Sequence, residues 1–270
     1  MIRKKEFTVG IGIIDGHFHI GAEAARWVDD VTWQTALKLM DHLDIERAIS
    51  ANLFIFPQNG CQMERGYQID ADIYEKSNHR IYTYFGYHPG CNERSLQVIR
   101  DHWSEPQCVG IKIHPNNSRV FADDESFRPV WEIAKELNLP IMSHTWDTST
   151  YNPGQKYAFT GLFEKYVREY PEVTFIFGHS GGRYNGIKTA IDIGMRYPNV
   201  HFDIGGDIWP LGFLEELVDK IGADRIMYGS DYTMIEQRPM LGVVYGANIS
   251  NLEKEKILRH TAARVFFHEE

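Results

Sequence analysis

Apolar runs of strand length alternate with amphipathic segments of helical periodicity along the whole chain. The apolar positions within residues 125–138, for example, recur at the i, i+3, i+4, i+7 spacing of one helix face. These positions are Phe127, Val130, Trp131, Ala134 and Leu137. The β-rich runs between such segments predict strands at residues 12–20, 47–54, 81–88, 109–114, 141–144, 174–179, 200–204 and 226–231.

Strands that alternate with helices pair in parallel through right-handed crossovers. An open doubly wound sheet would show the same alternation, but the turn after the first strand reads DGHFHIG and lacks the GxGxxG phosphate fingerprint. No change of composition or low-complexity linker divides the chain. We therefore predict an α/β fold, a single (β/α)8 barrel domain over residues 1–270, with residues 252–267 as a closing helix.

Composition and charge narrow the partners and the compartment. The 270 residues include 28 Lys and Arg against 37 Asp and Glu, and no basic run is long enough to follow a phosphate backbone, so we expect no nucleic-acid partner. The apolar runs are too short to span a membrane, and the N-terminal one is too interrupted for a secretory signal. Three cysteines, Cys61, Cys91 and Cys108, lack CxxC spacing and indicate a reducing compartment. We expect a cytoplasmic protein that acts on a small molecule, with a homodimer left open.

Histidines and one aspartate stand at the predicted carboxyl ends of strands, where barrel enzymes place their active sites. His17 and His19 are two apart on one strand and face the same side, which suits bidentate metal binding. Asp15 shares that face one layer lower, where it could orient a histidine through a hydrogen bond. His144 and Asp231 close the fifth and eighth strands. Together these side chains make a donor set of three nitrogens and one oxygen that suits Zn²⁺ and leaves room for a water.

Two residues are candidates for proton transfer and for polarisation of a substrate. Asp231 could take the proton of a metal-activated water and return it to a leaving group. His179, in the segment FGHSGG, follows the sixth strand and could hydrogen-bond the same water or a substrate carbonyl. Neighbouring glycines would keep the backbone slim there and allow close approach of a ligand.

Six ordered motifs from residue 12 to residue 267, IDGHFHIG, GIKIHP, IMSHT, FGHSGG, YGSDYT and TAARVFF, resemble the amidohydrolase superfamily. The likeness is greatest to the amidohydrolase-related (amidohydrolase 2) branch, which includes aminocarboxymuconate-semialdehyde decarboxylase. The resemblance implies a distorted TIM-like barrel of the metal-dependent hydrolase type with a divalent metal, usually zinc, at its mouth. The ligands that it implies are His17, His19, His144 and Asp231, with Asp231 also the base and His179 orienting the water.

Lys112 leaves the number of metals open. Superfamily members with two metals bridge them with a carboxylated lysine on the fourth strand, and both strand-end histidines are present here. GIKIHP looks like the mononuclear branch, so we predict one ion, most often Zn²⁺, with Mn²⁺ or Fe²⁺ as alternatives.

Further side chains after the strands indicate the substrate. Lys112, His114, Arg183 and His88 could make the mouth positive, and the loops after the fifth and seventh strands bring Trp146 and Trp209. We expect a small carboxylated or carbonyl-bearing substrate and, as the leading function, hydrolysis of an amide, ester or lactone. The alternatives are non-oxidative decarboxylation of an unsaturated or aromatic acid and, second, a catalytically idle metal-binding barrel.

Overall fold

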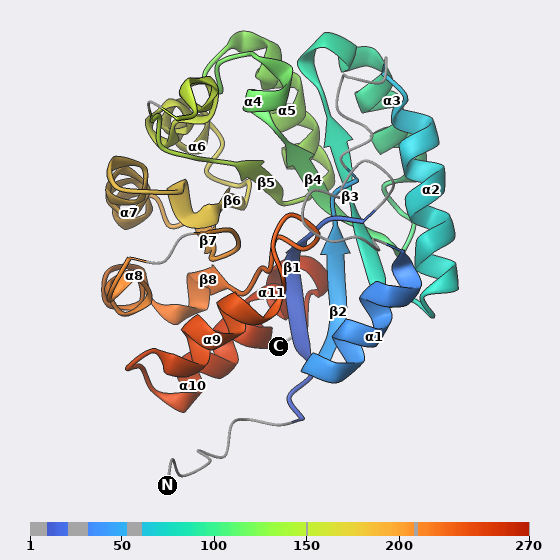
Figure 1. Cartoon of the computed structure of the whole chain (residues 1–270). Helices are drawn as coiled ribbons and strands as arrows, with labels where there is room; N and C mark the ends of the chain where they lie inside the picture. Colours follow the sequence, from blue (N-terminus) through green and yellow to red (C-terminus); the bar gives the residue numbers. More distant parts are fainter. Residues whose placement is uncertain (1–9, 21–31, 53–60, 150, 208–209, 270) are drawn as a thin grey trace, which may run out of the picture.

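Eight parallel strands form one sheet in the order β1 to β8, and helices form an outer ring around it (Figure 1). The computed structural model describes residues 10–20, 32–52, 61–149, 151–207 and 210–269. The strands are β1 (Ile13–Phe18), β2 (Ile45–Ser50), β3 (Ile81–Tyr87), β4 (Cys108–Ile113), β5 (Ile141–His144), β6 (Phe175–Gly178), β7 (Val200–Asp203) and β8 (Ile226–Met227). The strand order never reverses, which excludes the doubly wound alternative and confirms the (β/α)8 barrel.

The helices follow the strands in turn. The ring consists of α1 (Trp33–Leu43), α2 (Met63–Lys76), α3 (Asn92–His102), α4 (Pro115–Ser118), α5 (Arg128–Leu137), α6 (Glu164–Glu169), α7 (Asn185–Arg196), α8 (Phe213–Ile221) and α9 (Arg238–Gly246). The predicted closing helix comprises α10 (Asn251–Glu255), a π-helical turn (Lys256–His260) and α11 (Thr261–Phe267). It begins at a capping box, in which the Ser250 hydroxyl accepts the Glu253 N–H and the Glu253 carboxylate accepts the Ser250 N–H.

The barrel interior is a separate apolar core that is closed at one end. Tyr84, Met142 and Met227 meet there, and Phe266 of α11 packs against the same cluster. Arg259, in the turn before α11, donates to the Gly12 carbonyl just ahead of β1. α11 therefore closes the barrel at the amino-terminal ends of the strands. Buried polar side chains gather at the opposite end of the barrel, at the carboxyl ends of the strands.

β8 is shorter than the predicted strand 226–231, because the chain after Met227 hydrogen-bonds to β1 instead of extending the β7 ladder. The Gly16 N–H donates to the Tyr228 carbonyl at 2.9 Å, and the Asp231 N–H donates to the His17 carbonyl at 2.8 Å. Asp231 has a φ of 60°, in the left-handed region. These contacts nearly close the barrel and set Asp231 beside β1.

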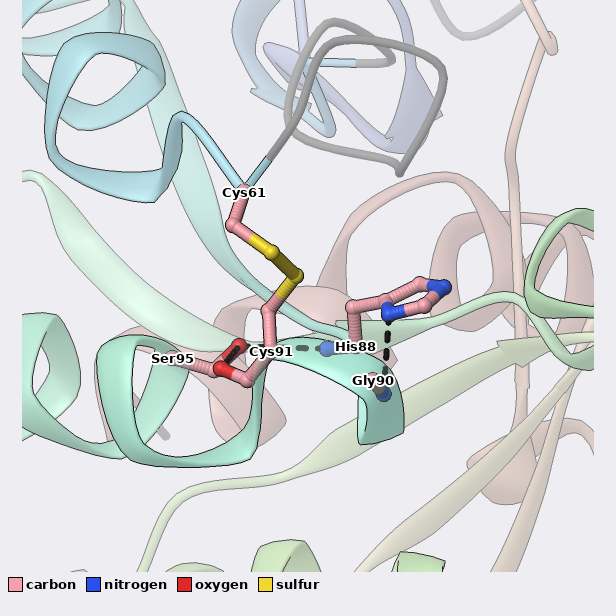
Figure 2. Close-up of a disulfide and its surroundings, with 5 residues drawn as sticks. All are labelled: Cys61, His88, Gly90, Cys91 and Ser95. Carbon is pink, nitrogen blue, oxygen red and sulfur yellow. Dashed lines mark hydrogen bonds between the residues drawn. A yellow bond between two sulfur atoms is a disulfide. The ribbon is translucent and has the colours of Figure 1, made fainter.

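Two of the three cysteines are paired. Cys61, which precedes α2, forms a disulfide with Cys91, which follows β3, and their Cα atoms are 5.7 Å apart (Figure 2). Cys108 is a buried free thiol. This pairing removes the support that the cysteine pattern lent to a reducing compartment. No helix in the described part of the chain is long and apolar enough to cross a bilayer.

Candidate metal centre

Three buried side chains converge at the carboxyl end of the barrel. His17 of β1, His179 after β6 and Asp231 after β8 each offer one ligand atom, and these atoms all lie within 4.8 Å of one another. The Oδ1 atom of Asp231 is 3.6 Å from the Nε2 of His17 and 3.1 Å from the Nε2 of His19. The predicted convergence of His17 and His19 therefore occurs at the Asp231 carboxylate.

The hydrogen bonds that His17 and His19 make through Nδ1 determine which ring atoms face this carboxylate. The Nδ1 of His17 donates to Oδ2 of Asp203 at 2.7 Å, and the Nδ1 of His19 donates to the Ala51 carbonyl at 2.8 Å. Because both partners can only accept, each Nδ1 carries a proton and each Nε2 is the ring nitrogen that faces inward. A metal ion bound to Asp231 would therefore meet these two nitrogens, as the Lys112 ammonium does at the Nε2 of His17.

His144 and His179 show the same arrangement on the other side of the mouth. The Nε2 of His144 donates to the Oε1 of Gln155 at 2.9 Å, and the Nδ1 of His179 donates to the Gly205 carbonyl at 3.0 Å. His144 Nδ1 and His179 Nε2 then face each other, 3.1 Å apart. Two imidazole nitrogens bound at ~2.1 Å to one ion are separated by about 3 to 3.4 Å, so this spacing fits a shared cation.

Protonation states agree with a metal site. Burial, together with the nearby charge of Lys112, lowers the pKa of His17 well below its usual value. Burial beside His179 lowers the pKa of His144 to about 3. Burial alone would raise the pKa of Asp231, but the facing imidazoles of His179 and His19 outweigh it and lower that pKa. A neutral His17, a neutral His144 and an ionised Asp231 are the forms in which these groups bind a divalent ion.

Lys112 reaches into the same cluster from β4. Its Nζ donates to the Nε2 of His17 at 2.8 Å, and the side chain is almost completely buried. Burial lowers the pKa of this ammonium to about 8, although Asp203 and Asp231 act in the opposite direction. The lysine therefore competes with a metal ion for the His17 lone pair, and its place is compatible with either predicted role.

A row of aromatic rings borders the centre. The rings of His114 and His144 stack with centroids 4.3 Å apart and planes 9° apart. Trp146 continues the row, 6.1 Å from His144 at 4°, and meets His179 edge to face at 5.2 Å. His114 and Trp146, both predicted near the substrate, thus flank the His144 side of the mouth.

Two of the remaining predicted residues, Arg183 and His88, lie outside the cluster. The guanidinium of Arg183 is half exposed, pairs with Asp207 and lies 5.7 Å from the Trp146 ring. His88 follows β3 and is buried, and its Nδ1 accepts the Gly90 N–H at 3.0 Å, beside the disulfide (Figure 2). Trp209 lies outside the described residues.

Asp203 and Gln155 complete the centre although the sequence analysis did not select them. The orienting role predicted for Asp15 is wrong, because its carboxylate accepts the backbone N–H groups of His17 and Ser230, and Asp203 holds the His17 ring. Asp203 is the last residue of β7 and the second to last of the predicted strand 200–204, and that position near a strand end was the available signal. Gln155 lies in a 3₁₀ segment (Pro153–Ala158) where no pattern distinguishes it.

Comparisons with known proteins agree with this architecture. A family model described as amidohydrolase matches residues 14–267. Among curated proteins, no significant match was found.

Three solved structures share the fold. A 2,6-dihydroxybenzoate decarboxylase from Rhizobium has 18% identity and a TM-score of 0.72, with 96% of this chain and 99% of that chain covered. A dihydroxybenzoic acid decarboxylase from Polaromonas sp., solved with manganese and 2-nitroresorcinol, has 18% identity and a TM-score of 0.70, with 95% and 97% covered. An uncharacterised TIM-barrel protein from Bordetella bronchiseptica has 14% identity and a TM-score of 0.74, with 94% and 98% covered.

Proposed function

Because the chain belongs to the amidohydrolase family, we propose that it is a metal-dependent decarboxylase of an aromatic or otherwise unsaturated carboxylic acid. The observation that carries the metal dependence is the convergence of inward-facing imidazole nitrogens on the Asp231 carboxylate. His17, His19, His144, His179 and Asp231 are the residues that would hold the ion. We propose one ion, Zn²⁺ or Mn²⁺, since nitrogen and carboxylate donors accommodate both.

The surroundings of the centre support an anionic, planar substrate. A bound divalent ion would supply positive charge that attracts and orients such a substrate. The buried Lys112 ammonium adds a second positive charge at the same place. The stacked rings of His114, His144 and Trp146 border the centre with aromatic surface that an aromatic substrate can contact. Two of the structures that share this fold are named as decarboxylases of dihydroxybenzoic acids.

In this reaction the bond between the substrate carbon and its carboxyl group breaks and CO₂ leaves. The electron pair of that bond stays on the substrate carbon, which then takes up a proton. The proton comes from solvent water, and we assign its relay to the substrate carbon to Asp231, which is buried at the mouth. His179 lies next to it and holds the reacting end of the substrate.

Hydrolysis of an amide, ester or lactone is the second candidate. The observation that favours it is the position of Asp231 beside His17 and His179, where its carboxylate could accept the proton of a water held at the same centre. The same residues would bind the substrate, so the two candidates differ in the bond that breaks.

The test is a product assay with the metal-loaded protein. We would incubate it with 2,6-dihydroxybenzoate, and separately with aryl esters and lactones, and measure CO₂ and the organic products. We expect CO₂ and 1,3-dihydroxybenzene, lost in Asp231→Asn and kept in the surface control Asp192→Asn, whose side chain is 70% exposed. Hydrolysis without CO₂ would favour the second candidate. Stoichiometric metal without turnover of any compound would support the catalytically idle barrel.

A further inference from the structure

Asp203, the last residue of β7, hydrogen-bonds to several parts of the candidate metal centre at once. Its side chain is completely buried. Its Oδ2 accepts the Nδ1–H of His17 at 2.7 Å and the backbone N–H of His179 at 2.8 Å, and its Oδ1 accepts the Gly205 N–H at 2.5 Å. We propose that Asp203 is a positioning residue that sets the tautomer of His17 and the placement of His179 for metal binding, an inference that rests on the proposed metal dependence.

The first effect is on His17. Of the four outer partners of the imidazoles, Asp203 is the charged one, since the others are the carbonyls of Ala51 and Gly205 and the amide of Gln155. A carboxylate that accepts the Nδ1–H keeps the proton away from Nε2 and makes that nitrogen a better donor to a metal. His17 is thereby the imidazole whose ligand atom is most strongly determined.

The second effect is on His179, which Asp203 holds in two ways. The carboxylate accepts its backbone N–H directly, and it also fixes Gly205, whose carbonyl accepts the Nδ1–H of the His179 ring. His179 and Ser180 have φ values of 62° and 48°, in the left-handed region that non-glycine residues seldom adopt. The Ser180 hydroxyl donates to the Asp203 backbone carbonyl at 2.7 Å. The carboxylate and the backbone carbonyl of Asp203 therefore both hold the turn at His179 and Ser180.

The third observation is the space around the carboxylate. A Cβ atom at Gly229 would lie 2.3 Å from Oδ1 of Asp203, and one at Gly205 would lie 2.7 Å from it. Both distances are shorter than any Cβ atom tolerates, so the backbone at Gly205 and Gly229 packs directly against this carboxylate. A group that only accepts hydrogen bonds satisfies all three donors here. The amide of asparagine would instead turn its NH₂ towards one of them.

The test compares Asp203→Asn with wild type and with the surface variant Asp192→Asn. Three measurements are made on metal-free protein: circular dichroism, the ¹⁵N shifts of the His17 ring, and calorimetric titration with Zn²⁺ or Mn²⁺ alone. For Asp203→Asn we expect native circular dichroism, loss of the Nδ1–H tautomer of His17 and ~10- to 100-fold weaker metal binding. Asp192→Asn should match wild type in all three.

A second variant covers the case in which Asp203→Asn does not fold. Gly205→Ala keeps the Asp203 charge but places a Cβ against its Oδ1, so it should weaken metal binding in the same direction. Unchanged affinity and an unchanged His17 tautomer in either folded variant would overturn the proposal. If wild type binds no metal, the proposed function fails, while the His17 tautomer still tests Asp203: a shift in Asp203→Asn supports its positioning role, and no shift refutes it.

Discussion

Gln155 determines which nitrogen His144 presents to the metal, and its replacement gives a prediction with a definite sign. The side chain is buried, and its Oε1 accepts the Nε2–H of His144 at 2.9 Å, which leaves Nδ1 facing His179. Gln155→Leu removes this acceptor and leaves a buried N–H without a partner. We expect metal binding to weaken, because the ring loses the contact that holds Nδ1 inward.

The magnitude follows from the cost of an unsatisfied buried donor. That cost is about 1 to 3 kcal/mol. The His144 ring avoids it by changing its tautomer or by rotating, and either change takes Nδ1 away as a metal ligand. Since ~1.4 kcal/mol corresponds to a factor of ten, metal affinity should fall roughly 5- to 150-fold. Gln155→Glu should act oppositely, because a carboxylate accepts the same N–H more strongly and raises the basicity of Nδ1.

The assay is calorimetric titration of metal-free Gln155→Leu, Gln155→Glu and wild-type protein with Zn²⁺, after circular dichroism has shown that each is folded. Tighter binding by Gln155→Leu would refute the reasoning, because it would mean that His144 binds through the Nε2 that Gln155 otherwise occupies. Equal affinities in all three proteins would show that His144 is not a ligand.

Three further predictions concern stability. Cys61→Ser should lower the free energy of unfolding by about 2 to 4 kcal/mol in urea, and a reductant should lower wild type to the same value; no difference under oxidising conditions would contradict this. Burial lowers the pKa of His201 to about 4, so this residue alone should cost the metal-free protein about 3 kcal/mol of stability as pH falls from 6.5 to 4, because unfolding then takes up a proton. His201→Phe should flatten this dependence in urea titrations at successive pH values. Burial raises the pKa of Asp70 to about 8, so the stability that its protonated form contributes is lost as pH rises through that value. The free energy of unfolding of Asp70→Asn minus that of wild type should therefore be at least ~1 kcal/mol larger at pH 9 than at pH 5.

The site shows where inference from local pattern succeeds. His17 and His19 were predictable because strand geometry places alternate side chains on one face. His144, His179 and Asp231 were predictable because the carboxyl ends of barrel strands all meet at one mouth. Both rules act over a few residues or follow from the fold class, so an alternating pattern is enough to apply them.

The partners of those side chains come from much farther along the chain. Asp203 is 186 residues from His17, and Asp15, the nearer carboxylate, is the wrong partner because its Oδ1 accepts two backbone N–H groups. The pairing of Cys61 with Cys91 likewise depends on the packing of the α2 and α3 connections, which cysteine spacing alone does not show.

By itself, the sequence determined the strand order, the barrel and the identity of the residues at its mouth, because hydrophobic periodicity and strand-end position are local properties. The tertiary structure alone decided which nitrogen of each histidine faces inward, since that depends on acceptors supplied by other strands and loops. Asp203 for His17, Ala51 for His19, Gly205 for His179 and Gln155 for His144 are brought into place when the barrel closes. Closure therefore converts a set of strand-end histidines into a centre whose lone pairs converge.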